Sequence, residues 1–147
     1  MRTPLLTFLL LFLSSACVLA QADTCDSLQR KSIAKISRDY TYAKTFPMMK
    51  RTGEAASSAL VMSEGSVYTV KFSAVGGEEK IVLNLVNNGT VMASSYNKVT
   101  QRCLDGFTVK CEKTGMYYFN YEIRESSKEK DKKSVCGYIS VGFKRSN

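Results

Sequence analysis

The chain has 147 residues, of which 21 are lysine or arginine, 13 are aspartate or glutamate and none is histidine, so its formal net charge is +8. The lack of histidine and of any Cys-x-x-Cys pair excludes the usual zinc sites built from thiolates and imidazoles, and it removes the commonest general base of enzymes. No cofactor or catalytic motif stands out, so we expect no metal site, no cofactor and no catalytic residues.

The N-terminus has the pattern of a signal peptide. Arg2 precedes a mostly apolar run from Pro4 to Leu19, and small residues then follow at the spacing that signal peptidase requires. The run of about 16 apolar positions is shorter than the roughly 20 that a membrane-spanning helix needs. We predict that residues 1–22 are the signal peptide, that cleavage falls near Ala20 or Ala22, and that the protein is secreted or periplasmic.

Cys17 leaves a second interpretation open. The residues Ser15-Ala16-Cys17 fit the end of a bacterial lipoprotein signal, although Ser14 stands where an aliphatic residue is usual. A lipoprotein anchored at Cys17 is therefore the alternative to simple export.

The mature chain has the size of one domain. About 125 residues would remain after cleavage, enough for a core of their own. We expect a helix and a first extended segment in residues 23–55 and a β-sandwich in residues 56–147, together forming a single, monomeric domain. A mature net charge of about +7 favours acidic partners such as anionic glycans, phospholipid headgroups or nucleic acid, whereas scattered lysines that keep the protein soluble are the simpler explanation.

Four cysteines follow the signal peptide, at positions 25, 103, 111 and 136. An even number in an oxidising compartment suggests disulfides, and four cysteines allow three pairings. We favour a bond between Cys111 and Cys136, because they flank an aromatic strand predicted at residues 116–124, which could bring them together.

The hydrophobic pattern changes from a helical to a strand period early in the chain. Apolar residues three or four apart predict a short amphipathic helix over residues 25–40. An extended segment should then run from Tyr40 to Phe46 and end at Pro47, which cannot donate a ladder hydrogen bond. A loop is expected at residues 51–54.

Short alternating runs separated by turn residues predict an all-β fold. The runs lie at residues 58–62, 68–74, 81–85, 91–96, 107–111, 117–123 and 139–143. Asn87-Asn88-Gly89 should form a hairpin turn, because Asn and Gly tolerate positive φ. Together with the first extended segment, these runs predict an antiparallel, jelly-roll-like β-sandwich of about eight strands with a short N-terminal helix.

Five of these segments resemble the bacterial pre-peptidase C-terminal type of secreted β-sandwich. They are Tyr68-Thr-Val-Lys-Phe, Ile81-Val-Leu-Asn-Leu, Asn88-Gly-Thr-Val-Met-Ala-Ser, Thr114-Gly-Met-Tyr-Tyr-Phe and Gly137-Tyr-Ile-Ser-Val. The resemblance spans residues 56–143 and implies a noncatalytic, jelly-roll-like module of the kind linked to binding of polysaccharide or matrix protein. The chain departs from the family in its N-terminal helix and in lacking an obvious acidic cluster for calcium.

Strand alternation also predicts a ligand-binding surface. The apolar neighbours of Tyr118 and Tyr138 should face the core, and because successive residues of a strand face opposite sides, both tyrosines should point outward. If the two strands form a hairpin through residues 125–134, both rings share one face of a sheet. Exposed tyrosines suit sugars or peptides, and we expect Lys71 and Lys110 to assist them.

Three further motifs receive a structural interpretation. Asn88-Gly89-Thr90 is a glycosylation sequon, but we favour a simple turn. Glu78 and Glu79 are expected to be solubilising loop residues. The mixed charges of residues 124–134 indicate a solvated loop rather than a specific nucleic-acid site.

These patterns favour an exported, noncatalytic binding module for a polysaccharide or for an extracellular or envelope protein. A small secreted hydrolase or hydrolase inhibitor is one alternative. A structural cell-envelope protein is the other.

Overall fold

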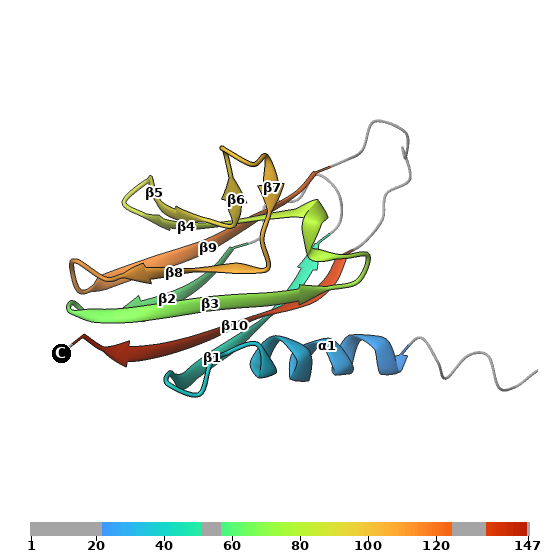
Figure 1. Ribbon diagram of the computed structural model, residues 1–147, viewed down its shortest axis with the longest axis horizontal. Helices are drawn as coiled ribbons and strands as arrows, with labels where there is room; N and C mark the ends of the chain where they lie inside the picture. Colours follow the sequence, from blue (N-terminus) through green and yellow to red (C-terminus); the bar gives the residue numbers. More distant parts are fainter. Residues whose placement is uncertain (1–21, 51–56, 125–134, 147) are drawn as a thin grey trace, which may run out of the picture.

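The computed structural model describes residues 22–50, 57–124 and 135–146, and these form two four-stranded antiparallel sheets with one N-terminal helix (Figure 1). Sheet A has the strand order β1-β10-β3-β8, and sheet B has the order β2-β9-β4-β5. A two-stranded hairpin, β6-β7, and one 3-10 turn, η1, complete the fold. The expectations for the signal peptide, for Cys17, for the loop at residues 51–54 and for most of the run 124–134 fall outside the described residues.

The elements follow one another in the order α1 (Ala22–Ala34), β1 (Thr41–Lys50), β2 (Ser57–Met62), β3 (Ser66–Ala74), η1 (Glu78–Lys80), β4 (Ile81–Asn87), β5 (Thr90–Ser94), β6 (Tyr96–Asn97), β7 (Arg102–Cys103), β8 (Gly106–Lys110), β9 (Gly115–Ile123) and β10 (Val135–Arg145). The predicted all-β sandwich with a short N-terminal helix is confirmed. The eight strands of the two main sheets match the number expected from the alternating runs.

The core lies between the two sheets. Alternate side chains of each strand point into it, because successive residues of a strand face opposite sides. Phe46 of sheet A and Phe119 of sheet B meet there, with ring centroids 5.7 Å apart. The fully buried core side chains are Met48, Met62, Val70, Phe72, Ile81, Leu83, Leu85, Phe119, Ile139 and Val141.

The turn between β4 and β5 forms as predicted. It consists of two residues, Asn88 with a φ of 48° and Gly89 with a φ of 77°. Both angles lie in the left-handed region that Asn and Gly adopt at the lowest cost, and two such residues make the tight turn that suits a twisted hairpin.

Helix α1 covers the outer face of sheet A, on the side away from sheet B (Figure 1). It is shorter than the expected helix over residues 25–40. After Ala34 the hydrogen bonds tighten, since Ile36 N donates to Ile33 O at 3.0 Å, and the chain turns into β1. None of the helices in the described ranges is long and apolar enough to cross a membrane.

Strand β1 continues through Pro47 to Lys50, so the predicted end of the extended segment at Pro47 is wrong. The reason is the position of β1 at the edge of sheet A, where it pairs with β10 alone. A proline without an N–H is tolerated on an edge strand, because its nitrogen can face solvent.

Residues 117–123 and 139–143 do not form a hairpin, so the condition for a shared face of Tyr118 and Tyr138 is not met. Strand β9 pairs with β2 and β4 in sheet B, whereas β10 pairs with β1 and β3 in sheet A. The two strands are neighbours in the sequence but lie in different layers of the sandwich (Figure 1).

Cys136 is bonded to Cys25 of α1 and not to Cys111, which is a free, buried thiol. Val75 N donates to Cys136 O at one end of β3, whereas Cys111 N donates to Ser66 O at the other end. The nine residues of β3 therefore separate the two cysteines by about 30 Å, far beyond the reach of a disulfide. Cys103 is the second free thiol, and it is only partly exposed.

Candidate functional site

The sandwich separates the predicted ligand-binding residues. Lys71 of β3, Lys110 of β8 and Tyr138 of β10 lie on the outer face of sheet A, where they alternate with core residues. Tyr118 of β9 lies on the outer face of sheet B, on the opposite side of the molecule. The two tyrosines therefore do not share a sheet face, and one small ligand cannot stack on both.

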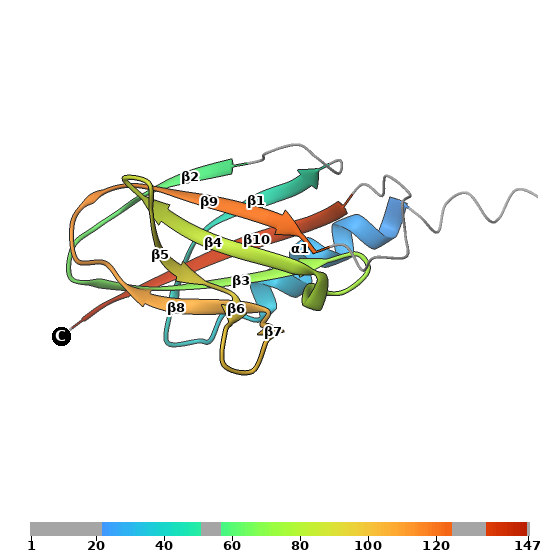
Figure 2. The same cartoon turned by 90° about the horizontal axis from the view of Figure 1, so that it is seen from above.

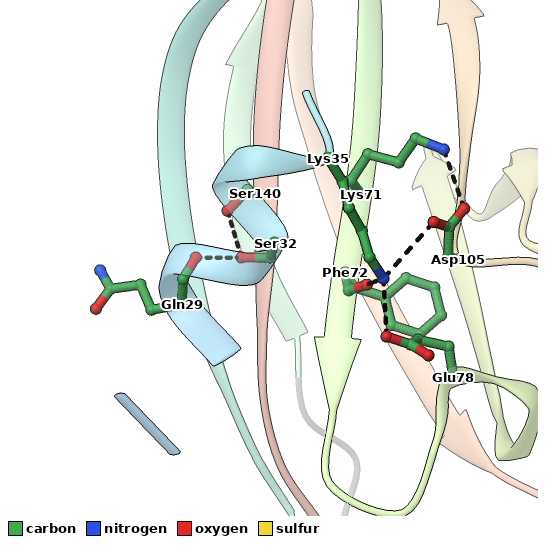
Figure 3. A network of polar contacts seen from close by, with 8 residues as sticks. All are labelled: Gln29, Ser32, Lys35, Lys71, Phe72, Glu78, Asp105 and Ser140. Atoms are coloured by element: carbon green, nitrogen blue, oxygen red, sulfur yellow. Dashed lines mark hydrogen bonds and ion pairs between the residues drawn. The ribbon is translucent and has the colours of Figure 1, made fainter. Parts of the chain in front are cut away.

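The outer face of sheet A is occupied by α1. Ser32 of the helix and Ser140 of β10 are both fully buried, and their hydroxyl oxygens are 2.7 Å apart (Figure 3). Thr45 of β1 hydrogen-bonds to the same Ser140 hydroxyl at 2.8 Å. Buried hydroxyls need such partners, because an unpaired polar group away from water costs free energy. The helix is thus fitted to this face as part of the fold.

Lys35 extends this covering through a network of ion pairs (Figure 3). Its Nζ donates to Phe72 O at 2.9 Å and to Glu78 Oε1 at 2.8 Å, and it lies 3.6 Å from Asp105 Oδ2. Lys71 Nζ donates to Asp105 Oδ1 at 3.0 Å. Lys71 therefore already has a partner, and Glu78 is not merely a solubilising loop residue, because it holds the end of α1.

The charges of this network stabilise one another. Burial raises the pKa of Glu78, but the hydrogen bond and charge of Lys35 outweigh that effect and hold it below its usual value. The same balance applies to Asp105, where burial is outweighed by Lys71 and Lys35. Both carboxylates therefore stay ionised at neutral pH and serve as ion-pair partners.

Sheet B, in contrast, leaves its outer face open, since no described helix lies over it (Figure 1). One row crosses all four strands and consists of Ala59, Tyr118, Val86 and Val91 in register. Val61 of β2 and Met116 of β9 form the adjacent pair. We call these six residues the sheet B face. Four of its large side chains are exposed, from 43% at Tyr118 to 58% at Val61, whereas Val86 is half-buried. Neighbouring exposed apolar side chains are typical of surfaces that contact other proteins.

A cavity adjoins the sheet B face at Val61. It has a volume of about 220 Å³ and lies between the two sheets. This is smaller than the roughly 300 Å³ or more of common small-molecule sites, so it suits a single side chain of a partner. Its lining residues are Ala43, Leu60, Val61, Ser63, Ser66, Tyr68, Phe143 and Arg145.

The β6-β7 hairpin, residues 96–103, was missed by the sequence patterns. It rises from the β5 edge of sheet B and projects from the body of the sandwich (Figures 1 and 2). The guanidinium of Arg124 lies 4.5 Å from the centre of the Tyr96 ring. Hydrogen bonding to Tyr96 and Cys103 raises the pKa of Arg124 above its already high value. Asn97 is the sequence feature that could have indicated the turn, because Asn side chains often bond to the backbone two residues on.

Metal binding finds no support in the described part of the chain, where no group of three or more Cys, Asp or Glu side chains could hold an ion. Acid–base chemistry would require titratable groups that face a common cavity. The cavity beside Val61 is lined by one arginine and hydroxyl groups and by no carboxylate.

No protein-family model and no curated protein matches the sequence. The resemblance to the pre-peptidase C-terminal type thus stays a prediction. Among solved structures, the chain is similar to the crystal structure of Aeromonas hydrophila PliG, a periplasmic lysozyme inhibitor of g-type lysozyme. The TM-score is 0.53 and the sequence identity 13%, with 75% of this chain and 92% of the PliG chain covered. At this identity, the likeness shows a shared fold.

Proposed function

We propose that the protein is an exported, noncatalytic inhibitor that binds a glycoside hydrolase of the lysozyme kind. The observation that carries the proposal is the likeness of its fold to PliG over 92% of that inhibitor's chain. Fold alone does not determine function, so the proposal also depends on what the surface of this chain offers a partner.

The surface supports a protein as the partner. The sheet B face presents Val61, Met116 and Tyr118, and Val91 on the opposite edge strand, on a sheet that no described helix covers. Aromatic residues and methionine are enriched in protein interfaces, and a tyrosine offers a large contact area at a low entropic cost. The Cys25–Cys136 disulfide suits a secreted or periplasmic location, where thiols are oxidised.

Inhibition is tested by turbidity of a bacterial cell-wall suspension. The purified mature protein, with its disulfide intact, is mixed with a g-type lysozyme and, separately, with a c-type lysozyme. We expect clearing of the suspension to slow in proportion to the added protein until about one equivalent is reached. Full lysozyme activity in the presence of a large excess of the protein, with both enzymes, would contradict the proposal.

Two controls separate inhibition from the other candidate functions. If the protein only coats the polysaccharide, it will sediment with cell walls when no enzyme is present, and more substrate will relieve its effect. An inhibitor of the enzyme binds lysozyme in the absence of substrate, as measured by calorimetry.

The sheet B face is tested in the same calorimetric experiment. Exchange of Tyr118 and Met116 together for alanine should weaken binding at least tenfold, because buried interface side chains of this kind often contribute 1–2 kcal/mol or more each. Tyr42→Ala is the matched control, since Tyr42 of β1 is similarly exposed but lies in sheet A. Equal weakening by Tyr42→Ala would move the interface away from the sheet B face.

A further inference from the structure

The tip of the β6-β7 hairpin presents an apolar side chain almost entirely to solvent. Val99 is 93% exposed, the highest value among the exposed large hydrophobic residues of the described chain. A valine so placed contributes nothing to the core, and its exposed apolar area has no stabilising role in the fold. Lys98, next to it, and Arg102 of β7 are exposed too.

The backbone of the tip is held in one conformation. Asn97 Oδ1 accepts hydrogen bonds from Val99 N at 2.9 Å and from Thr100 N at 3.1 Å. Gln101 completes the turn with a φ of 54°. Pairing of Tyr96 with Cys103 and of Asn97 with Arg102 closes the hairpin below the turn.

The base of the hairpin is anchored to sheet B by Ser95, which is fully buried. Ser95 N donates to Leu83 O at 2.8 Å, and Ser95 Oγ accepts from Leu83 N at 2.9 Å. Leu104 N then donates to Ser95 O at 2.8 Å, so both ends of the hairpin are fixed to the same residue. A loop that is ordered before binding loses little conformational entropy when it binds a partner.

The charge of the tip indicates what the partner offers. Lys98 and Arg102 form no ion pair with any residue in the described ranges. Lys98 precedes Val99 and Arg102 lies on β7 opposite Asn97, so the end of the hairpin combines one apolar side chain with two cations. Glycoside hydrolases cleave their substrates between a pair of Asp or Glu side chains at the bottom of a cleft. A carboxylate-lined cleft therefore complements the tip in charge.

From these observations we infer that the β6-β7 hairpin enters the substrate cleft of the hydrolase, with Val99 leading and with Lys98 and Arg102 beside the enzyme's carboxylates. The inference rests on the proposed function and names the part of the chain that blocks the enzyme. The hairpin rises on the same side of the sandwich as the sheet B face (Figure 1), so one partner can contact both.

A charge-matched pair of variants tests the inference. The hairpin variant carries Lys98→Gln and Arg102→Gln. The control variant carries Arg30→Gln and Lys31→Gln, which remove the same charges from the exposed surface of α1 on the far side of the molecule. We expect the inhibition constant for lysozyme to rise at least tenfold in the hairpin variant and to stay within twofold in the control. Thermal unfolding of both variants verifies that the fold is retained.

Competition gives a second measurement that needs no variant. A soluble oligomer of N-acetylglucosamine occupies the cleft of lysozyme, so it should raise the apparent dissociation constant of the wild-type protein in proportion to its concentration. An apparent dissociation constant that does not change with the oligomer concentration would overturn the inference. An unchanged inhibition constant in the hairpin variant would also overturn it. In both cases the wild-type protein still inhibits, so the proposed function stands. If the wild-type protein inhibits neither lysozyme, the proposed function and the inference fail together.

Discussion

Cys25 at the beginning of α1 is joined to Cys136 at the beginning of β10, at a sequence separation of 111. The bond ties the helix to the central part of sheet A, where β10 lies between β1 and β3. It closes nearly the whole described chain into one loop.

Removal of this bond should destabilise the protein strongly. In the chain-entropy model, a disulfide that closes a loop of about 100 residues stabilises the folded state by roughly 4–5 kcal/mol. Removal of a native disulfide commonly lowers the free energy of unfolding by about 2–5 kcal/mol. We expect a loss of that size for the double change Cys25→Ser and Cys136→Ser, measured by urea unfolding. Cys103→Ser is the control and should change the free energy of unfolding little. Equal stability of the double variant and the wild type would contradict the assigned pairing.

Gly142 of β10 allows the segment that follows α1 to lie close against sheet A. A Cβ at this position would lie 2.8 Å from Ile36 Cγ2 and 3.2 Å from Tyr40 Cβ, so the segment after the helix would have to move. We expect Gly142→Ala to lower the free energy of unfolding by about 1–3 kcal/mol, the usual cost of overpacking. Gly115→Ala on β9 is the matched control, because its nearest contact would be an ordinary 3.7 Å. An equal effect of both changes would refute the steric explanation.

Tyr117 should make the protein sensitive to alkali. A hydrogen bond with the Cys111 thiol, together with burial, raises the pKa of Tyr117 to about 12, whereas an unfolded tyrosine ionises near 10. The folded chain then keeps a proton that the unfolded chain loses. The contribution of the Tyr117 proton to the free energy of unfolding is fully present below pH 10 and is lost as the pH rises from 10 to about 12. Unfolding free energies over this range should fall less steeply in Tyr117→Phe, and parallel pH profiles would exclude Tyr117 as the cause.

Lys35 should stabilise the protein through its carboxylate partners. Replacement by methionine leaves Phe72 O and Glu78 without their donor, and we expect a loss of about 1–2 kcal/mol at pH 7. The pKa values of Glu78 and Asp105 are lower in the folded state than in the unfolded state. Their contribution to the free energy of unfolding is therefore fully present above the unfolded pKa values near 4, and it is lost as the pH falls through the folded pKa values. Both side chains are partly exposed, so this acid loss is modest. The loss of stability at acid pH should be smaller still in Lys35→Met. Lys31→Met, on the exposed side of α1, should keep the wild-type pH dependence of the free energy of unfolding.

Local patterns predicted the strands well. In β3, β4 and β9 every second residue is buried, as the alternation indicated, and Asn88-Gly89 forms the expected turn. These features depend on residues close together in the chain. Pro47 shows the limit even there, because a proline ends a central strand but not an edge strand, and the sequence does not state which strand lies at an edge.

Pairing between distant segments could not be predicted in this way. Alternation turned Tyr118 and Tyr138 outward correctly, but the same alternation fits strands in one sheet or in two. The Cys25–Cys136 bond and the Lys35–Glu78 ion pair likewise join segments that no local pattern connects. The β6-β7 hairpin escaped notice for a different reason, since strands of two residues are too short to show a period.

The proline of β1 has a consequence for the protein at high concentration. An outer strand with free backbone groups can recruit the matching strand of another molecule and so begin a fibril. Pro47 interrupts the row of donors on β1, so a strand added there would lose a hydrogen bond near its middle. We therefore expect sheet A to end at β1, and the protein to resist growing into ordered aggregates along this edge even at high concentration.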